Sequence, residues 1–192
     1  MLKFIKEITW AEVFEGWRNR EAMHPGWIRT ATEIKGWPNW ESWRKFTASQ
    51  IGAESRLWKL YEFTDPMDDI SKMLVGPYGG WQSKSPEKNK YSFEELLDIP
   101  ENYEFFKNHS VVSSLLKGFP CPTEFIGLAR EDNSKIVCLE GHHRATAVAL
   151  AKKEGGKISC GNIRIALAQL PKNECSVLDA ALRRGSSKNP EV

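Results

Sequence analysis

Residues 135–154 read KIVCLEGHHRATAVALAKKE, and this stretch decides how the second half of the chain folds. The apolar run 135–139 predicts a short strand. Residues 145–154 are apolar on most faces of a helix, which predicts a buried helix that stops at Gly155-Gly156. The sequence therefore predicts a strand that runs into a central helix, with EGHHR (140–144) at the junction.

Further short elements surround this strand and helix. Strands are predicted where short apolar or aromatic runs are bounded by turn-forming residues: 56–63, 125–129, 135–139 and 163–170. Helices are predicted where caps and apolar periodicity coincide: 66–76 after the N-cap Asp65, 93–99 after the capping box of Ser92, 103–117 before Gly118, and 176–184. His109 lies on the apolar stripe of the third helix, which favours a core histidine over a ligand.

The first half of the chain has a different composition, because all eight tryptophans lie before residue 82. Trp10, Phe14 and Trp17 recur with helical spacing, and Trp40 and Trp43 repeat the pattern. An aromatic stripe is typical of a helix that packs on a core. The alternative is a stacking surface for nucleic-acid bases, which needs basic residues interleaved along a groove. We expect this segment to dock on the rest of the protein.

The charge balance limits the classes of partner. The 192 residues include 27 Lys and Arg against 25 Asp and Glu, a net charge of +2 that argues against nucleic-acid or anionic-membrane binding. No apolar run is long enough to span a bilayer, and charges interrupt the N-terminal residues where a secretory signal would be apolar. The sequence therefore predicts a cytoplasmic protein without a membrane partner.

The four cysteines, at positions 121, 138, 160 and 175, form no C-x-x-C pair. This spacing predicts neither a zinc site nor a redox dithiol, and reduced thiols are the expected state. Cys138 and Cys160 lie among apolar or small residues, which is typical of small buried side chains.

The junction 140–144 carries the residues best suited to hold a phosphate group. Gly141 lets the backbone approach a ligand, and the free amides of the first helical turn carry partial positive charge. Arg144 adds a fork of donors, and His142 and His143 can donate to an anion or accept a proton. Alternatively, these side chains only cap the helix, but histidine has no capping advantage over Ser or Asp, and arginine here opposes the helix dipole. We therefore predict a polyphosphate site.

The sequence LEGHHRATA (139–147) resembles the signature of the ParB/sulfiredoxin superfamily, in which a strand runs into an acidic-Gly-x-His-Arg or Gly-Glu-Arg-Arg turn followed by a helix. The resemblance covers about residues 120–170, is looser over 57–81 and does not reach the Trp-rich N-terminus. His142 stands where sulfiredoxins have their catalytic cysteine, which argues against sulfinic-acid reduction. Few residues follow Arg144, which argues against the helix-turn-helix domain of ParB partition proteins. The motif is nearest to the free-serine kinase branch.

The resemblance implies a role for each junction residue. Gly141, His143 and Arg144 would bind the phosphates of a nucleotide, with ATP, ADP and CTP as candidates. Glu140 would hold Mg²⁺ or act on a substrate hydroxyl, and His142 is the second catalytic candidate. The leading prediction is a nucleotide-binding protein that transfers a phosphoryl group to a small molecule. The alternative is a non-catalytic, nucleotide-responsive module that binds a protein or DNA partner.

The glycine-rich segment 76–81 is the second candidate site element, as a substrate loop formed by Tyr78, Gly79, Gly80 and Trp81. Three glycines and a proline in six positions predict a loop. Tyr78 and Trp81 are expected to be exposed on it, where a base or substrate could pack. The alternative, a loop that only reverses the direction of the chain and binds nothing, is equally compatible with the sequence.

Together these patterns predict an α+β fold in three parts. A helical, Trp-rich extension (1–55) precedes a ParB/sulfiredoxin-like nucleotide-binding core with a small mixed sheet (56–175). A short helix and a flexible tail follow (176–192). The sequence predicts no oligomeric state.

Overall fold

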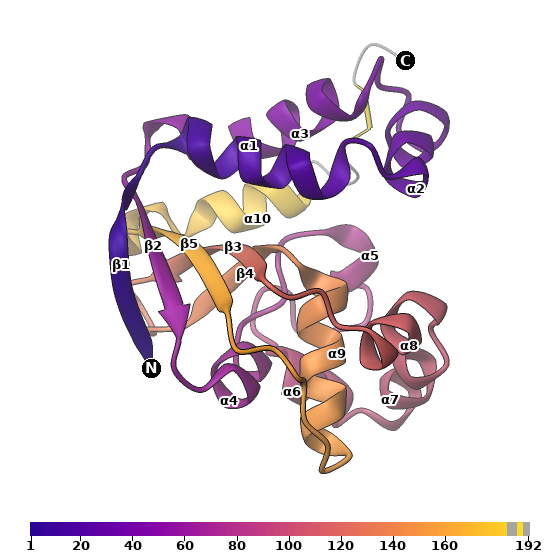
Figure 1. Ribbon diagram of the computed structural model, residues 1–192. Helices are drawn as coiled ribbons and strands as arrows, with labels where there is room; N and C mark the ends of the chain where they lie inside the picture. The colour runs from indigo at the N-terminus through magenta and orange to yellow at the C-terminus, as the bar shows by residue number, and fades with distance from the viewer. Residues whose placement is uncertain (184–187, 190–192) are drawn as a thin grey trace.

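The structure is a computed structural model that describes residues 1–183 and 188–189, and its fold is α+β, as predicted (Figure 1). Within these residues, five strands form one mixed sheet in the order β1-β2-β5-β3-β4. The strands are β1 (Leu2–Ile8), β2 (Trp58–Phe63), β3 (Thr123–Arg130), β4 (Ile136–Glu140) and β5 (Ile163–Leu170). β3 and β5 pair in parallel, and the other neighbours are antiparallel. The four strands predicted from the sequence are confirmed to within two residues at each end.

The first strand corrects the prediction that residues 1–55 form a helical extension. β1 pairs with β2 from Leu2 opposite Phe63 to Ile8 opposite Trp58, so residues 2–8 belong to the sheet. Most of β1 is exposed, and it carries charged residues typical of an edge strand. Because neither face of β1 is well buried, its sequence lacks the alternation that predicts a strand.

The Trp-rich helices cover one face of the sheet (Figure 1). They are α1 (Trp10–Glu21), α2 (Pro25–Arg29), a π-helical turn (Thr30–Ile34), α3 (Trp40–Ser49) and a 3-10 turn (Ala53–Ser55). Thr9 and Glu12 form a reciprocal cap at the start of α1. Trp17, Trp40 and Trp43 are buried in one core with Trp58 of β2. The prediction that the segment docks on the protein is confirmed, and the aromatic stripes are core.

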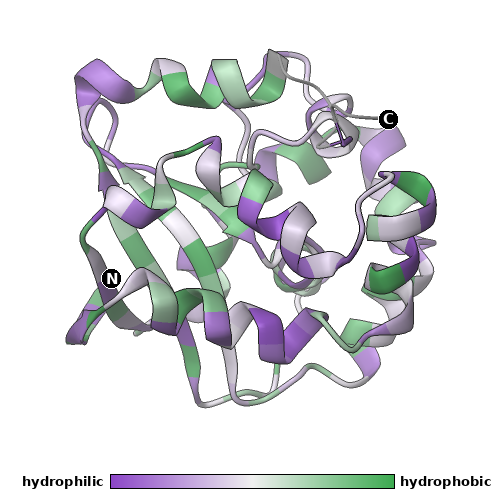
Figure 2. Ribbon diagram, turned by 90° about the horizontal axis from the view of Figure 1, so that it is seen from above, coloured by the Kyte–Doolittle hydropathy of each residue, from purple (hydrophilic) through white to green (hydrophobic). Residues whose placement is uncertain are grey.

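The other face of the sheet is covered by a second group of helices around α9 (His142–Lys153). They are α4 (Pro66–Ser71), α6 (Phe93–Leu97), α7 (Pro100–Lys107) and α8 (Ser110–Lys117), and each contacts α9. The prediction that α9 is central and buried is confirmed, because residues 144–151 of this helix are all buried. In Figure 2 the strands of the sheet are mostly green and white, and purple gathers on the surrounding helix ends and loops.

Three predicted segments differ in the structure. α4 ends at Ser71, well before Gly76, and the predicted loop 76–81 contains one helical turn, α5 (Gly79–Gln82). The predicted helix 103–117 is two helices, because the backbone leaves helical geometry at His109, between α7 and α8. Within α7, Phe105 is 46% exposed, and its neighbour Phe106 is buried. The apolar spacing continues across the break, so it cannot reveal the change of direction.

The C-terminal part follows the prediction where it is described. A 3-10 turn (Lys172–Glu174) leads from β5 to α10 (Ser176–Arg183), and Leu178 of α10 joins the core of the Trp-rich helices. The predicted flexible tail lies mostly outside the described residues. Within it, Asn189 donates hydrogen bonds to the carbonyls of Lys35 and Gly36. In the described part of the chain, no helix combines the length and apolar character needed to cross a membrane.

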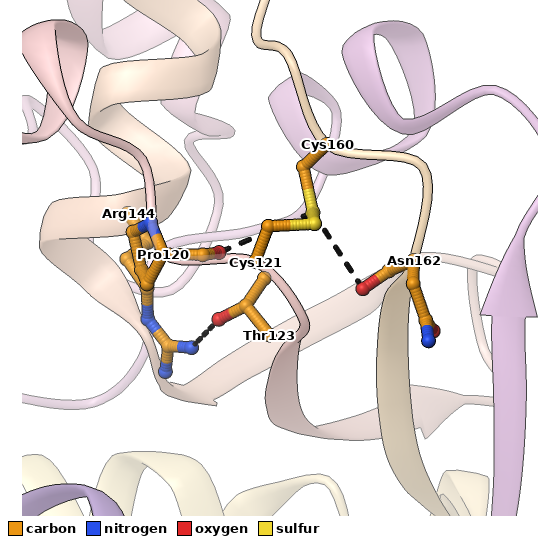
Figure 3. The surroundings of a disulfide bond; sticks show 6 residues. All are labelled: Pro120, Cys121, Thr123, Arg144, Cys160 and Asn162. Carbon is orange, nitrogen blue, oxygen red and sulfur yellow. Dashed lines mark hydrogen bonds between the residues drawn. A yellow bond between two sulfur atoms is a disulfide. The ribbon is translucent and has the colours of Figure 1, made fainter.

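A disulfide between Cys121 and Cys160 corrects the expectation of reduced thiols (Figure 3). Cys121 lies just before β3 and Cys160 just before β5, and the parallel register places Thr123 beside Ile163. The pairing of two distant strands therefore brings their leading residues together, with Cα atoms 5.5 Å apart. Spacing along the chain cannot show this. Cys138 is a free, fully buried thiol, as predicted.

Candidate functional site

A cleft of about 830 Å³ opens between the Trp-rich helices and the start of α9. Its volume is within the range of sites for small ligands. All nine residues that the sequence predicted for the site line this one cleft: Tyr78, Gly79, Gly80, Trp81, Glu140, Gly141, His142, His143 and Arg144. The structure therefore brings the glycine-rich segment and the EGHHR junction together.

The turn from β4 into α9 depends on Gly141, which precedes the first residue of the helix. Its φ is +106°, and a Cβ atom there would lie 2.4 Å from the ring of Phe125, so both backbone and space require glycine. The first bond of α9 runs from the amide of Ala145 to the carbonyl of Gly141, 2.8 Å away. No side chain in the described part of the chain caps the helix. The amides of residues 142–144 therefore lack an acceptor among the described residues, next to the cleft.

Arg144 contacts protein groups on both sides of its guanidinium. Its Nη2 donates to Oε1 of Glu140 at 2.5 Å. Its Nη1 donates to the carbonyl of Glu124 at 3.0 Å and to the hydroxyl of Thr123 (Figure 3). Arg144 is 8% exposed. The residue lines the cleft as predicted, but its side chain mainly fixes the β4–α9 junction to the start of β3.

Glu140 lies between two arginines. Its Oε1 accepts from Arg144, and its Oε2 accepts from Nη2 of Arg20 on α1, 3.4 Å away. Burial disfavours the charged form, but the positive charges of Arg144 and Arg20 outweigh it and lower the pKa of Glu140. The side chain is therefore an ionised carboxylate at the edge of the cleft.

His142 joins the glycine-rich segment to α9. Its Nε2 accepts a hydrogen bond from the amide of Gly76 at 3.0 Å, which places the ring proton on Nδ1, 3.9 Å from the sulfur of Cys138. Burial, with the charges of His143 and Arg44, lowers the pKa of His142 to about 3. The ring is neutral and its acceptor atom is occupied. In this geometry His142 holds the glycine-rich segment against α9, and its predicted catalytic role stays a prediction.

His143 also lines the cleft. Its ring packs against those of Trp81, His109 and Trp27, with centroids 5.1, 5.2 and 6.5 Å away. Burial, with the charge of His109, lowers the pKa of His143 to about 4. Within the described residues, no group forms a hydrogen bond with its ring nitrogens. A neutral His143 can therefore offer one donor and one acceptor to a ligand.

The glycine-rich segment corrects the expectation that Tyr78 and Trp81 are exposed. The hydroxyl of Tyr78 donates to the carbonyl of Leu139 at 2.9 Å, and burial raises the pKa of this phenol. Trp81 stacks on Phe106 with ring centroids 5.2 Å apart. Both side chains are half-buried and form a wall of the cleft, whereas Gly79 and Gly80 are exposed.

The sequence patterns missed the part of the site on the Trp-rich helices, which includes Arg20, Glu21, Trp27 and Arg44. Glu21 of α1 and Arg44 of α3 form a buried ion pair with an N–O distance of 2.5 Å. A signal for Glu21 was present, because it continues the helical spacing of Trp10, Phe14 and Trp17. A charged residue on an apolar stripe indicates a buried partner or a site.

The charges of the cleft favour an anion. Its described lining includes four basic side chains, Arg20, Lys35, Arg44 and Arg144, against two carboxylates, Glu21 and Glu140. The residues do not fit a resident metal ion. Each oxygen of Glu140 contacts a guanidinium, and no group of three metal-ligating side chains occurs in the described part of the chain. The predicted Mg²⁺ ligand Glu140 therefore has no supporting donor set.

Acid is expected to destabilise the protein between about pH 6.5 and 4. The pKa of a histidine is about 6.5 in the unfolded chain. In the folded protein the pKa is about 3 for His142 and about 4 for His143. The unfolded state therefore holds more protons in this window, so the free energy of unfolding rises with pH there, by at most about 1.4 kcal/mol per pH unit for each histidine. Urea unfolding at pH 7, 5.5 and 4.5 measures this slope.

Carboxylates also make the free energy of unfolding depend on pH in this range. The variant His143→Gln is therefore the informative comparison, because it removes only the contribution of one histidine. Its stability should depend less steeply on pH than that of the wild type. Identical slopes would show that His143 titrates normally in the folded protein.

The resemblance to the ParB/sulfiredoxin superfamily rests on residues 139–147, which form the end of β4, the Gly141 turn and the first half of α9. This strand, turn and helix have the order that the signature describes. The edge strand β1 and the Trp-rich helices lie outside residues 120–170, over which the resemblance extends. No protein-family model, curated protein or solved structure matches the chain, so the superfamily assignment stays a prediction.

Proposed function

We propose that the cleft binds a nucleotide, with its phosphates at the N-terminus of α9 and its base toward the Trp-rich helices. The observation that carries this proposal is the uncapped start of α9. Its first amides, at residues 142–144, have no acceptor among the described residues and lie at an aromatic-walled cleft with an excess of basic side chains. Amides at a helix N-terminus bind phosphate through hydrogen bonds and through the helix dipole.

The other walls support a ligand with an aromatic part. Trp17, Trp27, Trp43, Tyr78 and Trp81 line the same cleft. Aromatic side chains stack on bases of any sequence, and a contact of this kind contributes about 1–3 kcal/mol per base. A nucleotide combines the two chemistries that this cleft provides, a flat ring and a chain of anionic oxygens. ATP, ADP and CTP are the candidates to test.

The variant His143→Ala is expected to weaken nucleotide binding about 3- to 10-fold. His143 is neutral at pH 7, so it contributes an uncharged hydrogen bond worth about 0.5–1.5 kcal/mol. Isothermal titration of the variant with each nucleotide, with and without Mg²⁺, measures the change.

Lys153→Ala is the matched control, because it removes a charge from the opposite end of the same helix, where Lys153 pairs with Asp98. It should leave the affinity unchanged. Equal affinities of wild type and His143→Ala would remove His143 from the proposed phosphate site.

Phosphoryl transfer to a small hydroxyl-bearing molecule is a second candidate function, favoured by Glu140. This ionised carboxylate lies one residue before the turn that would hold the phosphates. In such a reaction the substrate oxygen would bond to the terminal phosphorus while the bridging P–O bond breaks, its electrons remaining on the departing nucleotide. Glu140 would take the hydroxyl proton through Oε2, once the longer contact with Arg20 opens.

Glu140→Gln is expected to abolish this turnover while nucleotide binding survives, because an amide keeps the shape of the carboxylate but cannot take the proton. The assay is nucleotide consumption with a panel of small hydroxyl compounds that includes serine. Turnover that persists in the variant would exclude Glu140 as the base. No wild-type turnover across a broad panel would favour the non-catalytic, nucleotide-responsive module.

A further inference from the structure

The ion pair between Glu21 and Arg44 has an asymmetric geometry. Nε and Nη2 of Arg44 both donate to Oε2 of Glu21, at 3.0 and 2.5 Å, and Nε1 of Trp40 donates to the same oxygen at 3.0 Å. Guanidinium–carboxylate pairs commonly use both oxygens in two parallel bonds. Here three donors converge on one oxygen.

This arrangement leaves two polar atoms without a hydrogen bond among the described residues: Oε1 of Glu21 and Nη1 of Arg44. Both residues line the cleft, and both side chains are about 8% exposed. Neither atom is fully enclosed by protein, in contrast to the buried and unpaired Nε1 of Trp17 and Nε of Arg20 beside them. A buried ion pair contributes most when its remaining donors and acceptors are satisfied. The pair therefore presents one acceptor and one donor to the cleft.

The guanidinium is held in a fixed position by tryptophans. Its central carbon lies 3.8 Å from the ring centroid of Trp43, 4.8 Å from that of Trp17 and 5.1 Å from that of Trp27. Trp27 also packs against His143 at the start of α9. The ion pair and the proposed phosphate site thus line the same cleft and both contact Trp27.

We infer that Glu21 and Arg44 recognise the hydrogen-bonding edge of a nucleobase. Oε1 of Glu21 would accept from an amino N–H of the base, and Nη1 of Arg44 would donate to the neighbouring ring nitrogen or carbonyl oxygen. This inference rests on the proposed function and extends it, because it assigns base recognition to the Trp-rich helices. A ligand with phosphates alone would leave both atoms unpaired. The base is therefore part of what the cleft selects.

The first test uses wild-type protein, so it does not depend on the folding of a variant. The affinity for ATP and CTP is compared with that for inorganic tripolyphosphate and for the analogues in which the amino group of the base is dimethylated. Dimethylation keeps the ring and the phosphates but removes the N–H donors. The nucleotide that binds more tightly should exceed tripolyphosphate by at least about 10-fold, and dimethylation should remove about 10-fold of its affinity.

Variants then assign the effect to the ion pair. Glu21→Gln and Arg44→Lys should lower nucleotide affinity toward that of tripolyphosphate and leave tripolyphosphate binding unchanged. His143→Ala should weaken both ligands. Equal binding of nucleotide, dimethylated nucleotide and tripolyphosphate would overturn base recognition and leave the phosphate site standing. Failure of wild-type protein to bind any of them would overturn the proposed function as well.

Discussion

Replacing Arg144 with methionine is expected to lower the free energy of unfolding by about 3–5 kcal/mol, because the change leaves Glu140 as a buried charge with one distant partner. Arg144 donates to Glu140 of β4 and to Thr123 and the carbonyl of Glu124 in β3, so α9 loses contacts with two strands. Methionine keeps most of the volume, which separates the loss of charge from the creation of a cavity. Urea unfolding at pH 7 measures the difference. Arg144 is 8% exposed, so its removal is expected to affect the fold as well as the cleft.

Two controls make this prediction specific. Arg29→Met removes an arginine that pairs with Glu33 on the surface, where such pairs contribute at most about 1 kcal/mol. The double variant Arg144→Met with Glu140→Gln removes both charges and should lose less stability than Arg144→Met alone. A single variant as stable as the wild type would contradict the ion pair as the main support of the junction. Binding data for Arg144 variants are therefore interpretable only beside their stability.

The parts of the site that the sequence predicted are those encoded by neighbouring residues. The β4–Gly141–α9 junction could be read from 20 consecutive residues, because apolar periodicity changes there from strand to helix. The glycine-rich segment could be singled out by composition. Neither pattern predicts that the junction and the glycine-rich segment line one cleft, because their proximity depends on the contact between His142 and the backbone of Gly76.

The remaining parts depend on contacts between distant segments. The pairing of Cys121 with Cys160 follows from the parallel register of β3 and β5, which no local pattern encodes. β1 carries exposed charged residues in place of an alternating apolar pattern. Only its pairing with β2 identifies it as an edge strand. Glu21 and Arg44 come from two helices whose tryptophans dominate the pattern. Charged residues that interrupt an apolar stripe are the signal that local analysis can still use.

Replacing Gly76 with alanine is expected to destabilise the protein by roughly 2–4 kcal/mol and to distort the cleft. A Cβ atom at this position would lie 2.0 Å from the carbonyl oxygen of Cys138 and 2.8 Å from Nε2 of His142. The backbone next to Gly76 cannot easily move, because Leu74 forms two hydrogen bonds with β4. Its amide donates to the carbonyl of Ile136, and its carbonyl accepts from the amide of Cys138. Relief of the clash therefore requires Gly76 to shift relative to the fixed Leu74, which strains the segment and breaks the hydrogen bond from Gly76 to His142.

Gly80→Ala is the matched control, because a Cβ atom there meets nothing within 4 Å and the residue lies in the helical turn α5. Its stability should stay within about 1 kcal/mol of the wild type. Urea unfolding of both variants gives the energies, and nucleotide titration of the folded proteins reports on the cleft. Because α5 carries Trp81 onto the ring of His143, displacement of the segment should weaken binding in Gly76→Ala. Equal free energies of unfolding for the two variants would mean that the segment around Gly76 accommodates a methyl group without loss of stability. The close approach of Gly76 to β4 would then not be what holds α5 against the start of α9.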